Sequence, residues 1–92
     1  MGKITLTKAS NIGGKEVTEL APEFTALTGN DLIQAEAEAR AMGDNTPLIA
    51  ASMRYQAAVA ARALKCPADD VMALGAKDFT RVIAAVTRFL LA

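Results

Sequence analysis

The sequence predicts a small, mostly α-helical domain of three to four helices with a short N-terminal β-hairpin. Ala, the best helix former, fills 20 of the 92 positions, and the C-terminal segment 77–91 repeats apolar residues at helical spacing. Only 4% of the residues are aromatic, so we expect helices that pack closely through small side chains. The length suits one domain, 1–92, comprising a hairpin arm over 1–21 and a helical body over 28–92.

The hairpin is predicted by two short strand-like segments on either side of a glycine turn. Residues 3–7 alternate polar and apolar side chains, and residues 16–20 read as the returning strand. Between them, Asn11-Ile12-Gly13-Gly14 is a turn signal, because Gly tolerates positive φ. An isolated two-stranded hairpin is marginally stable, so this one must pack on the helices or pair with another chain.

Helix start and stop signals divide the next segment into two helices. Thr28 is placed to cap a first helix, Asp31 suits its positive N-terminal end, and Gly43 is a natural stop. Thr46-Pro47 repeats the start signal, with Thr as the cap and Pro at the first helical position. We therefore expect a second helix over 47–65.

The C-terminal part of the chain predicts a short helical segment followed by an amphipathic helix. Cys66-Pro67 interrupts the second helix, residues 67–74 form the short segment, and Gly75 ends it. The last helix, 77–91, has one apolar face that we expect to lie in the core. That face consists of Phe79, Val82, Ile83, Val86, Phe89 and Leu90.

The second helix carries two apolar stripes, which leaves two interpretations open. One stripe consists of Leu48, Tyr55 and Val59. The other consists of Ile49, Met53, Ala57, Ala60 and Leu64, offset by roughly a third of a turn. Either a central helix buries a wide arc inside the domain, or the second stripe faces a partner. On the second interpretation, these five residues are the candidate protein-binding site.

The charge pattern argues against nucleic acid and membrane partners. Ten basic residues balance ten acidic ones, whereas proteins that bind DNA phosphates usually have a basic excess. The N-terminus lacks the apolar region of a signal peptide. The apolar segment 47–65 contains Arg54, Arg62 and Lys65, so it is not a plain membrane span. We expect a cytoplasmic protein.

No residue pattern predicts catalysis, a cofactor or a metal site. The chain has no His, which excludes imidazole-based nucleophile pairs and zinc ligation by His. Cys66 is the single cysteine and is expected to be a small, at least half-buried residue. Asp69 and Asp70 are explained by the start of a helix, and Gly13-Gly14-Lys15 lacks the other residues of a phosphate loop. We therefore expect no enzymatic activity.

The order of segments resembles the small tail assembly chaperones of Mu-like, contractile-tailed phages and prophages. The resemblance covers nearly the whole chain, although residues 21–24 replace a stretch that is often basic in that family. The similar segments are Ile4-Thr5-Leu6, 13–20, Thr28, Asp31-Leu32, Ala35-Glu36, 60–64, 67–71, 74–79 and the helix ending at Phe89-Leu90.

The resemblance implies a non-catalytic chaperone that binds the tape measure protein and assists assembly of the tail tube around it. It also implies a host cytoplasmic location, absence from the mature virion, and contact with the tail tube protein or further copies of the chain. Two alternatives stay open. One is a small helix-turn-helix regulator, with Arg81 and Arg88 on the exposed side of the last helix; the other is a toxin–antitoxin or adaptor component.

Overall fold

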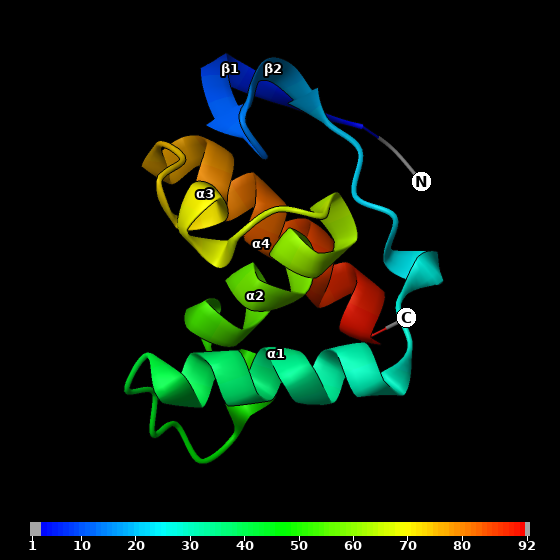
Figure 1. The fold of residues 1–92 in the computed structure, drawn as a ribbon, viewed down its shortest axis with the longest axis vertical. Coiled ribbons are helices and arrows are strands. Elements are labelled where there is room, and N and C mark those ends of the chain that lie inside the picture. The colour runs from blue at the N-terminus through cyan, green and yellow to red at the C-terminus, as the bar shows by residue number, and fades with distance from the viewer. Residues whose placement is uncertain (1–2, 92) are drawn as a thin grey trace.

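The computed structural model describes residues 3–91, so residues 1, 2 and 92 of the predicted domain lie outside the described range. It confirms a mostly helical fold with an N-terminal hairpin, and Figure 1 shows the hairpin at one end and α1 at the other, with α2 between α1 and α4. The elements are β1 (Ile4–Ile12), β2 (Lys15–Leu20), α1 (Gly29–Ala41), α2 (Met53–Leu64), α3 (Ala68–Met72) and α4 (Ala76–Leu91), with 3-10 turns at Phe24–Ala26 and Ile49–Ala51.

The hairpin turns at the predicted glycines and contains a large bulge. Gly13 and Gly14 have φ values of 62° and 86°, which suit the two-residue turn that joins antiparallel strands. The pairing shifts between Thr5 and Ser10, so residues 6–9 of β1 lie opposite the single residue Thr18. Bulges bend the strand that contains them, and Leu6 at the start of this one is buried in the core.

Helix α1 begins and ends where the sequence predicts. Thr28 accepts a hydrogen bond from the Asp31 N–H, and the Asp31 carboxylate accepts one from the Thr28 N–H, which forms a capping box. Gly43 follows the helix with a φ of 93°, a left-handed conformation that glycine adopts without a steric penalty. The buried residues of α1 are Ala35 and Ala39, so this helix lies close to its neighbour α2.

Helix α2 starts six residues later than the predicted boundary at residue 47. The Ser52 hydroxyl accepts hydrogen bonds from the N–H groups of Arg54 and Tyr55, so Ser52 is the N-cap. Residues 49–51 form a separate 3-10 turn instead of the first helical turn. The Thr46-Pro47 pattern therefore marks a loop, and the buried pair of Ser52 and Asp44 fixes the true start.

Helix α2 is the centre of the domain. Eight of its twelve residues are buried, and it packs against α1, α3 and α4. Its centre is completely buried at Ala57, Ala58, Val59 and Ala60. Small side chains allow neighbouring helices to approach α2 from several sides, which is why an Ala-rich segment occupies this position.

The apolar face of α4 lies against the core as predicted, although its residues are buried to different extents. Val82 and Val86 have no exposed surface, while Phe79, Ile83, Phe89 and Leu90 are half-buried. The ring of Phe89 stacks on Phe24 with centroids 5.0 Å apart, which joins the end of α4 to the segment after the hairpin. Within residues 3–91, no helix is both long enough and apolar enough to cross a membrane.

Candidate protein-binding groove

An apolar groove lies between the start of α2 and the second half of α4. Its volume is about 480 Å³, and three of its lining residues are large apolar ones that are mostly exposed: Leu48 is 69% exposed, Met53 63% and Leu91 81%. Large apolar side chains with this exposure are informative when they gather at one place instead of being scattered. The groove is lined by Leu48, Ala50, Ala51, Met53, Gln56, Ile83, Thr87, Leu90 and Leu91.

Local hydrogen bonds fix one wall of the groove. The buried Asp44 carboxylate accepts hydrogen bonds from the Ser52 hydroxyl and from the Thr46 N–H, the latter at 2.9 Å. These bonds lower the pKa of Asp44 from 3.8 to about 2. The Gln56 amide donates to the Ala50 carbonyl at 2.8 Å and holds the 3-10 turn against the first turn of α2. The wall is therefore held in place by bonds within the chain itself.

The chemistry of the groove is that of a binding surface. None of its lining residues is titratable, and its polar side chains are the amide of Gln56 and the hydroxyl of Thr87. The Gln56 amide is already bonded to Ala50. The groove can therefore bury apolar side chains of a partner, but it offers no acid, base or nucleophile.

The five predicted protein-binding residues do not form one exposed surface in this structure. Met53 lines the groove, while Ala57 and Ala60 have no exposed surface, and Ile49 and Leu64 are half-buried against the core. Helical periodicity places Arg62, which contacts α1, roughly opposite Met53 and Ala60 on α2. The stripe therefore lies on the side of α2 away from α1, and Met53 is its accessible member.

The sequence pattern predicts other places for several residues of the groove. It puts Leu48 on the first stripe of α2, which in the structure begins only at Met53, and it puts Ile83 and Leu90 on the core face of the last helix. These predictions consider the apolar pattern of each helix separately and do not include the contacts between two helices. The groove exists because the late start of α2 leaves Leu48 outside the helix, where it faces the end of α4.

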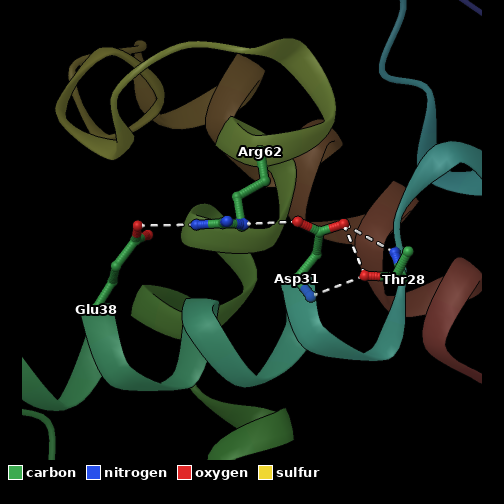
Figure 2. A network of polar contacts seen from close by, with 4 residues as sticks. All are labelled: Thr28, Asp31, Glu38 and Arg62. Atoms are coloured by element: carbon green, nitrogen blue, oxygen red, sulfur yellow. Dashed lines mark hydrogen bonds and ion pairs between the residues drawn. The ribbon is translucent and has the colours of Figure 1, made fainter.

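A polar cluster joins α1 to α2 on the side of α2 away from Met53. Arg62 extends from α2 and lies between two carboxylates of α1, 3.3 Å from Asp31 Oδ1 and 3.1 Å from Glu38 Oε2 (Figure 2). Hydrogen bonds from the Thr28 N–H, together with Arg62, lower the pKa of Asp31. All three charged side chains are partly exposed, so this cluster positions α1 and adds modest stability.

Asp70 and Cys66 have structural roles near the tip of the hairpin. The Asp70 carboxylate accepts a hydrogen bond from the Gly13 N–H at 2.9 Å, a contact that the sequence pattern did not predict. Cys66 is half-buried as expected, and burial together with the negative charge of Asp70 raises the pKa of its thiol. A raised pKa keeps the thiol protonated and weakly nucleophilic. Across residues 3–91, no three His, Cys, Asp or Glu side chains gather in a metal-binding cluster.

Asp78 is, like Asp44, a buried carboxylate that the sequence pattern does not single out. It is 1% exposed and accepts hydrogen bonds from the Thr7 N–H and the Thr7 hydroxyl, all at 3.0 Å. Burial would raise its pKa, but these hydrogen bonds and the nearby Arg81 lower it. Arg81 also donates to the Thr5 carbonyl at 2.8 Å, so two α4 side chains hold the bulged part of β1.

Comparisons of the chain with protein-family models, with curated proteins and with solved structures found no match.

Proposed function

We propose that this protein is a non-catalytic tail assembly chaperone that binds an apolar helical segment of the tape measure protein in the groove between α2 and α4. The observation that carries the proposal is the gathering of Leu48, Met53 and Leu91, all mostly exposed, around one apolar hollow. The identity of the partner rests on the resemblance to small phage tail assembly chaperones. Such a protein works in the host cytoplasm and leaves before the virion is complete.

The shape and composition of the groove favour a helix as the bound segment. Ala50 and Ala51 present small side chains, which permit close approach by a partner backbone. The unbranched Met53 side chain adapts to irregular apolar surfaces, and Leu48 and Leu91 supply apolar area. A helix that lays its apolar face into such a groove is a common mode of protein recognition.

The alternative of a DNA-binding regulator has less support. Arg81, one of the two arginines on the exposed side of α4, donates to the backbone of β1, and the chain has no net charge. Duplex binding depends on free basic side chains that contact phosphates. A toxin–antitoxin or adaptor protein would also use an apolar groove. Co-expression with the tape measure protein separates these roles from the chaperone role, because only the chaperone is expected to bind that partner.

The decisive experiment co-expresses the chain with the tape measure protein of the same phage or prophage. We expect the wild type to keep the tape measure protein soluble and to co-purify with it. Met53→Glu places a charge in the groove and should abolish both effects, because a buried unpaired charge is costly. Since Met53 is 63% exposed in the free protein, the variant should retain the circular dichroism spectrum and melting temperature of the wild type.

A matched control is available on α1. Ile33 is 64% exposed and lies outside the groove, so Ile33→Glu introduces the same charge at an equally exposed apolar position. This variant should bind like the wild type. If Met53→Glu binds the tape measure protein as well as Ile33→Glu does, the groove is not the binding site. If the wild type neither binds nor solubilises the tape measure protein, the chaperone function is wrong.

A further inference from the structure

One side of α4 carries a row of exposed residues that leads into the apolar groove. Residues three or four positions apart are neighbours on the surface of a helix. Five exposed residues of α4 follow one another at these steps and form what we call the α4 row: Lys77, Arg81, Ala84, Arg88 and Leu91. Leu91 also lines the groove, so the α4 row and the groove are parts of one continuous surface.

The exposed charge of α4 has a single sign. The helix contains three basic residues, all of them in the α4 row, and its one acidic residue is Asp78. Asp78 is 1% exposed and accepts hydrogen bonds from Thr7, so it offsets part of the Arg81 charge from inside the domain. The surface of α4 therefore has no exposed carboxylate, and a partner that carries carboxylates is attracted to it.

The stability of the domain does not account for all of these charges. Lys77 is the second residue of α4, at the positive end of the helix dipole, where a cation is unfavourable. Within residues 3–91, no carboxylate lies at ion-pair distance from Arg88. Arg81 uses one N–H group to hold the Thr5 carbonyl, and its guanidinium has further donors. These groups are free to bind an anionic partner.

We propose that the segment bound in the groove is an acidic amphipathic helix, whose apolar face fills the groove and whose flanking carboxylates pair with the basic residues of the α4 row. This inference rests on the proposed function, because it specifies the charge of the segment that the groove binds. A helix that covers Leu91 lies next to Arg88, since these two residues are neighbours on the surface of α4.

The middle of the α4 row has the shape and the donors that a carboxylate needs. The small side chain of Ala84 lies between Arg81 and Arg88 and permits close approach by another helix. A hollow of about 270 Å³ beside Ala84 is lined by both arginines and by Lys3, which also pairs with Glu19 at 3.7 Å. The planar guanidinium group of arginine binds carboxylates through two parallel hydrogen bonds.

A nucleic acid fits the same surface less well. Single strands bind through exposed aromatic side chains on which their bases stack. All aromatic residues of the chain lie within 3–91, and none of them is exposed: Phe24 and Tyr55 are buried, while Phe79 and Phe89 are half-buried. A phosphate backbone would also leave the adjoining apolar groove uncovered. An amphipathic helix accounts for both the apolar and the basic part of the surface.

Two synthetic helical peptides test the proposal with the full-length protein. Both carry the same stripe of leucines, and the positions that flank the stripe are Glu in one peptide and Gln in the other. Fluorescence anisotropy measures the affinity of the labelled peptides at low and high salt. At low salt, the wild type should bind the Glu peptide about tenfold more tightly than the Gln peptide. The difference should shrink at high salt, because exposed charges are screened.

Arg88→Glu tests the α4 row directly. This variant should lose the preference for the Glu peptide and bind the Gln peptide as the wild type does. Lys15→Glu is the matched control, because it makes the same change in net charge at an exposed residue outside the α4 row and the groove. It should keep the wild-type preference, and circular dichroism should show the same fold for both variants.

The outcomes separate this inference from the proposed function. Equal binding of the two peptides by the wild type, or an equal loss of preference in Arg88→Glu and Lys15→Glu, would overturn the inference. The groove would still be supported if Met53→Glu abolished binding of both peptides. If the wild type bound neither peptide, the inference would be wrong, and co-expression with the tape measure protein would decide the proposed function separately. Tight binding of an oligonucleotide that Arg88→Glu abolishes would assign the α4 row to nucleic acid instead.

Discussion

Replacing Ala57 by Leu tests whether the predicted stripe on α2 belongs to the core or to a partner. Ala57 has no exposed surface, so the larger side chain has no space unless the neighbouring helices move apart. Overpacking of this kind typically costs ~1–3 kcal/mol, while the change in helix propensity is only a few tenths of a kcal/mol. At about 0.05–0.15 kcal/mol per residue, the whole domain has a free energy of unfolding of ~5–14 kcal/mol. The variant therefore loses a substantial fraction of its stability.

The assay is thermal unfolding followed by circular dichroism, with urea unfolding as a second measurement. A loss of ~2 kcal/mol lowers the melting temperature of a domain this size by roughly 8–16 °C. Ala84→Leu is the matched control, because Ala84 is exposed on α4 and the same substitution should change the free energy of unfolding by less than ~0.5 kcal/mol. If Ala57→Leu melted like Ala84→Leu, Ala57 would not be buried between helices, and the stripe would again be a candidate surface for a partner.

Two further predictions concern acid and DNA. The pKa of Asp44 is about 2 in the folded protein and 3.8 ordinarily, so its stabilising effect is complete above pH 3.8 and is lost as the pH falls toward 2. Asp44→Asn should therefore be less stable than the wild type at neutral pH. In acid unfolding experiments, its free energy of unfolding should fall less steeply with pH than that of the wild type. A fluorescence titration with duplex DNA at physiological salt should show no binding in the sub-micromolar range, and tight, salt-sensitive binding would instead support the regulator alternative.

Local patterns in the sequence predicted the elements that are held by local interactions. The Gly13-Gly14 turn, the capping pair of Thr28 and Asp31, and the stop at Gly43 each depend on residues within a few positions of one another. The apolar face of α4 was also predicted, because its helical spacing is visible without knowing which element covers it. These features explain why the fold class was correct.

The errors arose where distant residues decide the structure. The start of α2 depends on Asp44, which lies eight residues before Ser52 and bonds to it. The contacts of Asp70 with Gly13 and of Asp78 with Thr7 cross 57 and 71 positions of the sequence, so a reading of neighbouring residues does not detect them. The groove was missed for the same reason, since its two walls come from different elements.

The bonds between the hairpin and the last two helices also set an order of events during synthesis. The hairpin is made before the residues that hold it, because Asp70, Asp78 and Arg81 are translated 57 to 76 positions after their partners. A two-stranded hairpin is only marginally stable alone, so it has no lasting structure on the ribosome until α4 emerges. Docking of the hairpin is therefore a long-range step of folding that waits until α4 has been made.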